Sequence, residues 1–194
     1  MKIIGLAGSH ASGKDTVAHY LEDQGFCHIS TSDIVRDEAM KQYGSIERPV
    51  LYKTANEIRQ TRGHGALSEM ALERFDAVKD QFQGLVVSGF RAMAEAQVIK
   101  DAGGTIIFTD APEQVRFERL RERARVEGGT LSFEEFKKRE EIENGGVDPA
   151  FDISAIKTIA DTVIVNDSDK EKFLDQIKQL LSQSWRILKT WKSL

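Results

Sequence analysis

The chain has 194 residues, with 40% hydrophobic and 30% charged residues, which are the proportions of one ordinary globular domain. A formal net charge of −4 argues against non-specific binding to nucleic acid or to membrane surfaces, and the apolar run at residues 3–7 is too short for a signal peptide or a membrane span. The lone Cys27 excludes an internal disulfide and fits a reducing cytoplasm, and its apolar neighbours favour a core residue over a nucleophile.

The first predicted strand, residues 3–7, runs into the loop GSHASGKDT at residues 8–16, after which a helix is expected. A strand, a glycine-bounded loop, a lysine and a helix make up the phosphate-binding P-loop, whose backbone N–H groups surround phosphate oxygens at the positive end of the helix. Lys14 adds a mobile charge that can follow the β- and γ-phosphates of a nucleotide. We therefore expect ATP to be bound by Gly8, Ser9, Ala11, Ser12, Gly13, Lys14, Asp15 and Thr16.

The position after the lysine departs from the usual P-loop, in which a serine or threonine hydroxyl binds Mg²⁺. Asp15 stands there, and Thr16 follows. An aspartate can hold Mg²⁺ directly or through water. An acidic residue in the first turn of a helix is also favoured by the helix dipole alone. Both interpretations stay open, with Asp15 as the candidate metal ligand and Thr16 as the hydroxyl for an α- or β-phosphate.

Further apolar runs predict buried strands at residues 26–29, 85–88, 105–109 and 162–165, separated by segments of helical length. Helices are expected at residues 92–100, from Pro112 to about residue 125, and at the end of the chain. Strands that alternate with helices predict an α/β protein, a three-layer α/β/α P-loop fold with a five-stranded parallel sheet. Ligands of such sheets bind at the carboxyl ends of the strands, which is where the P-loop lies.

Local patterns mark where two later helices begin and which face of the last one is buried. Ser132 and Glu135, like Ser168 and Glu171, have the spacing of a capping box. The last helix places apolar residues on one face with a period of 3.6. The residues of that face are Phe173, Ile177, Leu180, Leu181 and Ser184.

Two segments interrupt the alternation of strands and helices. Residues 33–83 are helical in pattern with no strand candidate, and residues 126–130 form a glycine-containing turn between two charged helices. We expect an insert and a lid, because both follow elements that end near the P-loop. The chain then forms one domain over residues 1–194, with a core at 1–32, 84–123 and 140–194, an insert at 33–83 and a lid at 124–139.

The helix after Pro112 carries a stripe of arginines. Arg116, Arg119 and Arg123 fall at i, i+3 and i+7 and so share one face. Glu127 is the only acidic residue of the helix on that side, whereas the other arginines have glutamate neighbours at i−3. The stripe favours contact with an anion for Arg119 and Arg123, and less so for Arg116.

Two further segments carry a family resemblance. ISTSDIVR at residues 29–36 resembles the ISTGDxLR segment of adenylate kinases, and SGFR at residues 88–91 is similar to their DGFPR. GKDTVA in the P-loop resembles kinases of deoxynucleoside monophosphates, and residues 113–120 and 160–166 resemble dephospho-CoA kinase. The chain thus resembles the nucleoside monophosphate kinase-like group of P-loop kinases over residues 1 to about 181.

The resemblance implies a role for each matching residue. Thr31, Asp33 and Arg36 would contact the acceptor, Arg91 would bind its phosphate, and residues 33–83 would form the acceptor-binding insert. On the other side of the P-loop, Arg119 and Arg123 would lie near the ATP base and phosphates, Arg139 would swing in when the lid closes, and Asn166 would lie near the adenine. Ser88 stands where these kinases have an aspartate that holds Mg²⁺ through water, and the proline of DGFPR is missing.

The sequence therefore predicts a cytoplasmic enzyme that uses ATP and Mg²⁺ to phosphorylate a nucleoside or deoxynucleoside monophosphate, with Lys14, Arg119, Arg123 and Arg139 as catalytic cations. Dephospho-CoA kinase is the enzymatic alternative, and a regulatory ATPase switch is the alternative from another class. We expect a small-molecule nucleotide acceptor as partner, no nucleic acid or membrane, and a monomer or homodimer.

Overall fold

The computed structural model describes residues 1–142, 152–167 and 169–190, but not the side chains of Arg139 and of residues 182–190. Its centre is a five-stranded sheet in the order β2-β3-β1-β4-β5, and all neighbouring strands are parallel. The strands are β1 (Lys2–Gly8), β2 (Phe26–Ser30), β3 (Gly84–Ser88), β4 (Thr105–Asp110) and β5 (Thr162–Val165). The predicted parallel sheet is confirmed, and each observed strand contains the apolar run that predicted it.

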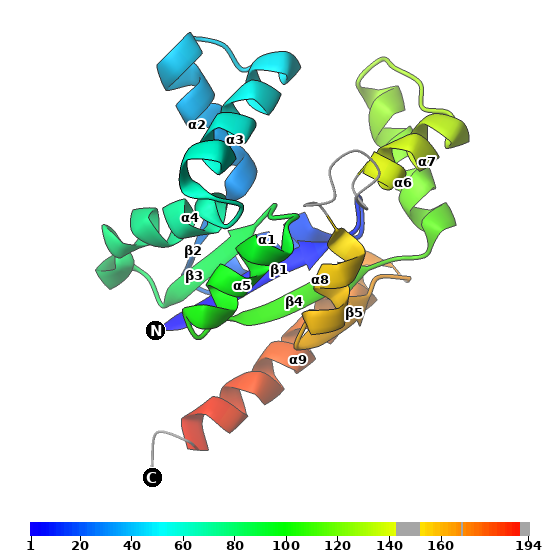
Figure 1. Ribbon diagram of the computed structural model, residues 1–194. Coiled ribbons are helices and arrows are strands. Elements are labelled where there is room, and N and C mark those ends of the chain that lie inside the picture. Colours follow the sequence, from blue (N-terminus) through cyan, green and yellow to red (C-terminus); the bar gives the residue numbers. More distant parts are fainter. Residues whose placement is uncertain (143–151, 168, 191–194) are drawn as a thin grey trace.

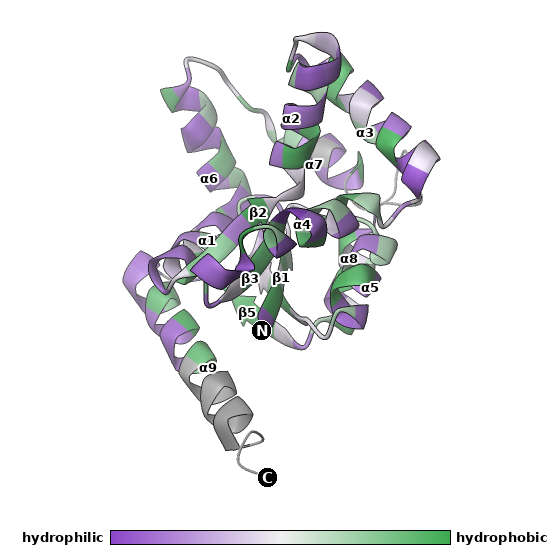
Figure 2. Cartoon of the chain, turned by 90° about the vertical axis from the view of Figure 1, so that its left-hand side faces the viewer, coloured by the Kyte–Doolittle hydropathy of each residue, from purple (hydrophilic) through white to green (hydrophobic). Residues whose placement is uncertain are grey.

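Helices cover both faces of the sheet, which confirms the three-layer architecture (Figure 1). One face is covered by α1 (Lys14–Asp23) and α9 (Lys170–Thr190), which pack on Leu6 and Val86. The other face is covered by α4 (Ala66–Asp76), α5 (Met93–Asp101) and α8 (Ile153–Ile159), which pack with Leu85 and Val87. Neighbouring residues of β3 thus point to opposite layers, as the two-residue period of a strand requires. In Figure 2 the strands are largely green, and purple is concentrated on the helices.

Two pairs of helices rise from the same end of the sheet (Figure 1). The first pair is α2 (Thr31–Tyr43) and α3 (Arg48–Arg62), and the second is α6 (Glu113–Val126) and α7 (Phe133–Glu141). The chain from α3 returns to the sheet through α4 and a short 3₁₀ helix, η1 (Lys79–Gln81), and α4 packs against β2 and β3. The extents of an acceptor-binding insert and of a lid remain predictions.

A small core holds α6 and α7 together. It consists of Phe117, Leu120, Leu131 and Phe136, all buried. The capping box at the start of α7 is confirmed, because the backbone N–H of Glu135 donates to Ser132 Oγ at 3.2 Å and that of Ser132 donates to Glu135 Oε2 at 2.8 Å.

The rest of the C-terminal pattern is confirmed in part. Phe173, Ile177 and Leu181 of α9 are buried, as the predicted apolar face requires. The other proposed capping residue, Ser168, lies outside the described residues, as do Trp191 and the side chains of Ser184 and Trp185.

Among the described helices, none combines the length and the apolar character that crossing a membrane requires.

Candidate active site

The P-loop leaves the central strand β1 and ends where α1 begins. Gly8 and Gly13 have φ of +150° and +103°, where L side chains are strained. A Cβ on Gly8 would lie 2.2 Å from the Thr109 carbonyl oxygen, and one on Gly13 would lie 2.5 Å from Asn166 Nδ2. Both positions therefore require glycine, because β4 and the end of β5 pack directly against the loop.

Polar contacts hold the loop in this shape. The Lys14 ammonium donates to the carbonyl oxygens of Gly8 at 2.8 Å and Ser9 at 2.9 Å. Ser12 is fully buried, and its hydroxyl lies 2.7 Å from that of Thr109 on β4. The lysine side chain thus lies across the loop. The contact of Ser12 with Thr109 also ties the loop to a strand 97 residues further along the chain.

A cavity of about 1020 Å³ opens at the carboxyl ends of the strands. It brings together most of the residues that the sequence predicted for the site. Of these, the cavity is lined by Gly8, Ala11, Gly13, Lys14, Asp15, Thr16, Asp33, Arg36, Arg91, Arg119, Arg123 and Asn166.

The remaining predicted residues lie elsewhere. Ser12 and Thr31 are buried and do not line the cavity. Ser9 lines a second cavity of about 500 Å³, and the side chain of Arg139 lies outside the described part of the chain.

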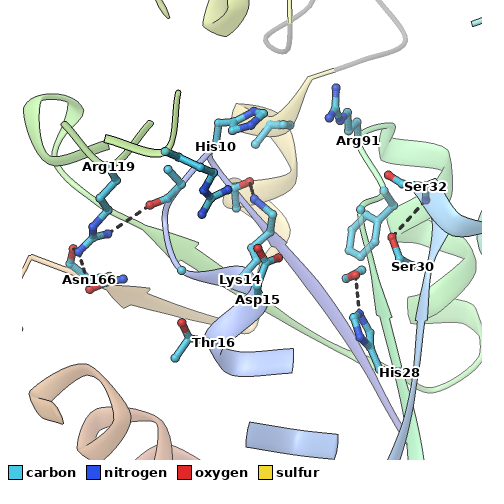
Figure 3. Close-up of a pocket in the computed structure, with 18 of the residues that line it drawn as sticks. His10, Lys14, Asp15, Thr16, His28, Ser30, Ser32, Arg91, Arg119 and Asn166 are labelled. Atoms are coloured by element: carbon cyan, nitrogen blue, oxygen red, sulfur yellow. Dashed lines mark hydrogen bonds between the residues drawn. The ribbon is translucent and has the colours of Figure 1, made fainter. Parts of the chain in front are cut away.

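The P-loop divides the cavity into two sides (Figure 3). Arg119 and Asn166 lie on one side of Lys14 and Asp15, and Arg91, Ser30, Ser32 and His28 lie on the other. We call the first side, with Arg123, the donor side, and the second, with Asp33, Arg36 and Ser88, the acceptor side.

A single guanidinium joins three segments on the donor side. Arg119 of α6 donates to Asn166 Oδ1 at 3.0 Å and to the carbonyl oxygen of Ala11 in the P-loop at 3.2 Å. The Asn166 amide in turn donates to the Ser12 carbonyl oxygen at 2.9 Å. Burial lowers the pKa of Arg119 below its ordinary value. Lys170 and Phe173 of α9 also line this side and were not predicted as site residues.

The arginine stripe of α6 is divided between the cavity and the small core that joins α6 and α7. Arg123 lines the cavity, and no hydrogen bond or ion pair of its side chain is found within the part of the chain that the structure describes. Arg116 is buried, pairs with Glu140 of α7 and donates from Nε to the Ala111 carbonyl oxygen at 2.9 Å. The acidic residues of α6 alone did not reveal Glu140, which α7 brings to Arg116 by folding back against α6.

On the acceptor side, the ends of β2 and β3 place short polar segments next to each other. Ser30 and Ser88 are paired in the register of the sheet, and Ser30 Oγ caps α2 by accepting from the Ser32 N–H at 3.2 Å. Arg36, one turn into α2, pairs with Asp33 at 2.5 Å, and both side chains are exposed. The ion pair leaves Arg36 within reach of solvent and of a ligand.

A buried glutamate fixes the backbone that carries Arg91. Glu95 is 1% exposed and accepts from the backbone N–H groups of Arg91 at 2.8 Å and Ala92 at 2.9 Å. Its other oxygen lies 4.0 Å from Arg59 Nη2 of α3. Burial raises the pKa of the Glu95 carboxyl, against the opposing effect of the two N–H donors and of Arg59 and Arg91. Sequence reasoning missed Glu95, since an acidic residue in a first helical turn has an ordinary structural explanation.

A histidine on β2 reaches the same side and was also missed. His28 Nε2 lies 2.7 Å from Ser88 Oγ, and both residues line the cavity (Figure 3). His28 Nδ1 lies 3.4 Å from Glu22 Oε1 at the end of α1. Because His28 lies inside a predicted strand, no local motif indicated that it lies close to Ser88.

The residues present fit a Mg²⁺ ion that arrives with a nucleotide. Among the described residues, no group of three or more histidine, cysteine, aspartate or glutamate side chains is placed to hold a metal. Asp15 is exposed to the cavity next to Lys14. Mg²⁺ usually takes one or two carboxylates and completes its shell with phosphate oxygens and water, so one aspartate beside the phosphates is a sufficient protein ligand.

Comparisons of sequence find a matching family model and several relatives. The family model described as "AAA domain" matches residues 4–143. A UPF0200 protein of Sulfurisphaera tokodaii is 32% identical over 186 residues, which cover 94% of this chain and 97% of that protein. A UPF0200 protein of Thermococcus kodakarensis is 28% identical and covers 93% and 97%. A UPF0200/UPF0201 protein of Archaeoglobus fulgidus is 29% identical over 93% of this chain, which spans only 55% of that longer protein.

Solved structures share the fold at low sequence identity. TT1252 from Thermus thermophilus superposes with a TM-score of 0.62 at 18% identity, covering 94% of this chain and 97% of that one. Dephospho-CoA kinase from Campylobacter jejuni has a TM-score of 0.57 at 19% identity, with coverage of 94% and 97%. Shikimate kinase from Aquifex aeolicus has a TM-score of 0.52 at 21% identity, with coverage of 96% and 98%. These likenesses show a P-loop kinase-like fold.

Proposed function

Because the chain belongs to the AAA-domain family of P-loop proteins and to the UPF0200 proteins, we propose that it is a kinase that transfers a phosphoryl group from ATP to a small anionic acceptor. The observation that carries the proposal is the single cavity with cationic side chains on both sides of the P-loop. A protein that only bound a nucleotide would need the donor side alone.

The donor side is suited to a nucleoside triphosphate. The backbone N–H groups at the start of α1 and the Lys14 ammonium would hold the phosphates. Arg119 and Arg123 would stabilise their charge, and Asn166 would lie at the base. When bound, Mg²⁺ would supply positive charge that neutralises the β- and γ-phosphates, with Asp15 as its protein ligand.

Catalysis here requires alignment and positive charge rather than a covalent intermediate. The transition state of phosphoryl transfer spreads negative charge over the moving group, so preorganised cations in a site shielded from water lower the barrier. Lys14, Arg119 and Arg123 fit that role. Arg139 of α7 stays a candidate for a cation that approaches when residues 124–139 close as a lid.

The acceptor side is suited to an anion held by Arg36 and Arg91, with Asp33 beside Arg36 and residues 33–83 as the acceptor-binding insert, whereas the buried Thr31 would not touch the anion. Two classes of acceptor fit. A nucleoside or deoxynucleoside monophosphate would react through its phosphate, as the resemblance to adenylate kinases implies. An anionic compound with a free hydroxyl is the second class, supported by the similarity in fold to a dephospho-CoA kinase.

The test is to incubate the protein with Mg·ATP and single acceptors, namely AMP, dAMP, other monophosphates, dephospho-CoA and shikimate, and to follow ADP formation. We expect at least one acceptor to raise the rate, and Lys14→Ala to abolish that increase. If ADP formation never depends on an acceptor, the kinase proposal is wrong and a regulatory ATPase switch takes its place.

A further inference from the structure

We infer that Ser88, His28 and Glu22 form a proton relay that accepts the proton of a hydroxyl acceptor, so that this kinase phosphorylates an alcohol rather than a phosphate. The inference rests on the proposed kinase function and deepens it. Its basis is a series of neighbouring polar side chains that begins at the cavity and ends at the surface. We call these three residues the relay.

The geometry of the relay is that of an oriented histidine. Ser88 Oγ and His28 Nε2 are 2.7 Å apart, and His28 Nδ1 is 3.4 Å from Glu22 Oε1. The contact of Nδ1 with the Glu22 carboxylate has the separation of an ion pair and not of a hydrogen bond, but the nearby negative charge favours a proton on Nδ1, and Nε2 then accepts from the serine hydroxyl. The contacts come from three different elements, β3, β2 and α1, so they depend on the fold and not on local sequence.

The relay lies where the reacting atoms of a kinase would meet. Ser88 ends β3, next to the P-loop strand in the sheet, and its neighbour in the register is Leu6 of β1. Both Ser88 and His28 line the cavity and are in contact with each other. Figure 3 shows His28 on the acceptor side, with Lys14 and Asp15 across from it. A hydroxyl between Arg91 and Lys14 would therefore approach Ser88.

The proton also has a way out. Glu22 is 40% exposed, and its second oxygen contacts the exposed His19 at 2.8 Å. The charge of Glu22 acts on this region, because it adds to burial in raising the pKa of the neighbouring Cys27 thiol. A proton that reaches His28 can thus pass to solvent at the end of α1.

The acceptor oxygen forms a bond to the γ-phosphorus of ATP while the bond from that phosphorus to the β–γ bridging oxygen breaks and ADP leaves. The acceptor proton passes to Ser88 Oγ, and the serine proton passes to His28 Nε2. A phosphate acceptor is already anionic and needs no such base, whereas an alcohol gains from one near neutral pH. The ligand class is therefore an anionic metabolite with a free hydroxyl.

The experiment compares Ser88→Ala and His28→Gln with the wild type, and uses His19→Gln as the matched control, because His19 touches the same glutamate outside the cavity. The probes are dephospho-CoA and shikimate as hydroxyl acceptors, AMP and dAMP as phosphate acceptors, and water in basal ATP hydrolysis. Phosphorus NMR distinguishes a phosphomonoester product from a phosphoanhydride. Thermal melting and ATP binding show whether each variant is folded.

We expect transfer to a hydroxyl acceptor, with kcat lowered about 10²-fold or more in His28→Gln and Ser88→Ala, while the KM for ATP stays within about twofold. The rising limb of the pH profile of kcat, for transfer and for hydrolysis, should disappear in His28→Gln and persist in His19→Gln. A merely structural role for His28 would not remove that limb.

The outcomes separate the two proposals. Phosphoanhydride products alone would leave the kinase proposal standing and overturn the relay. The relay would be overturned as well if the folded His28→Gln variant kept the wild-type kcat and the wild-type pH profile, measured by transfer or by basal hydrolysis. Hydrolysis that no acceptor stimulates would overturn the kinase function itself, and a protein with neither hydrolysis nor transfer would overturn both.

Discussion

The two sides of the cavity are built differently. On the donor side, buried or half-buried side chains join residues that are far apart in the chain: Ser12 to Thr109, Arg119 to Ala11 and Asn166 to Ser12. On the acceptor side, His28 and Ser88 are also joined across two strands, but the candidate anion ligand Arg36 has only an exposed, local partner, Asp33. A site with many fixed contacts is preorganised for one ligand, whereas a local surface pair leaves its residues free to adjust. The donor side should therefore tolerate substitution far less than the exposed pair of Arg36 and Asp33.

The largest effect should come from Gly8→Ala. A Cβ there would lie 2.2 Å from the Thr109 carbonyl oxygen, and φ is +150°, so either β4 or the P-loop must move. We expect a loss of about 3 kcal/mol or more in the free energy of unfolding and no measurable ATP binding. Urea denaturation and titration calorimetry measure the two effects.

Gly103→Ala is the control for backbone strain. Gly103 has φ of +75°, but a Cβ there meets nothing within 4 Å. It should cost only about 1 kcal/mol and leave ATP binding intact. Equal losses in the two variants would mean that the contact with β4 does not constrain the P-loop.

Next in size is Arg119→Ala. The variant removes both the cation and the link between Ala11 and Asn166. We expect ATP affinity to fall about 100-fold, because a half-buried charged donor is lost together with the shape of the donor side. Arg121→Ala, on the same helix but stacked over Phe117 and outside the lining of the cavity, should keep wild-type affinity. Isothermal titration with ATP compares the two, and similar affinities would refute the role of Arg119.

This contrast also explains what the sequence could predict. The P-loop and the strands follow from local rules, namely glycine positions, apolar runs and a lysine at a fixed spacing, and the structure confirms the fold that they imply. His28 and Glu95 could not be found in this way, because their contacts with Ser88 and with the backbone of Arg91 exist only once strands and helices pack. The pairing of Arg116 with Glu140 depends on how α7 folds back, which the stripe alone did not indicate.

Glu95 offers a test of whether the acceptor side has a fixed element of its own. Glu95→Ala would leave the N–H groups of Arg91 and Ala92 without their carboxylate. We expect the free energy of unfolding to fall by about 1–3 kcal/mol and the KM for the acceptor to rise, with the KM for ATP unchanged. Denaturation and steady-state kinetics measure these effects, and equal changes in both KM values would show that Arg91 is not specifically disturbed.

The pH dependence of stability sharpens the same test. Burial raises the pKa of Glu95 in the folded protein, so the folded state holds this proton more tightly than the unfolded state does. Its stabilising contribution is complete below the ordinary glutamate pKa and is lost as the pH rises through the folded value. Glu95→Gln keeps an acceptor oxygen but cannot ionise, so this part of the pH dependence should vanish. A wild type and a Gln variant with parallel stability curves would contradict the raised pKa.

The smallest and most selective effect should come from Arg36→Ala. The Arg36 side chain is 50% exposed and its partner Asp33 is 64% exposed, so the pair adds about 0–1 kcal/mol to stability and melting should hardly change. If Arg36 holds the anionic group of the acceptor, its loss should raise the acceptor KM about tenfold and leave the KM for ATP as it was. Arg74→Ala is the matched control, since Arg74 also forms an ion pair with an aspartate of α2, Asp37, but does not line the cavity. A residue that touches only the acceptor cannot weaken ATP binding as strongly as acceptor binding. If Arg36→Ala raised the KM for ATP as much as the KM for the acceptor, the two sides of the cavity would therefore not bind separate ligands.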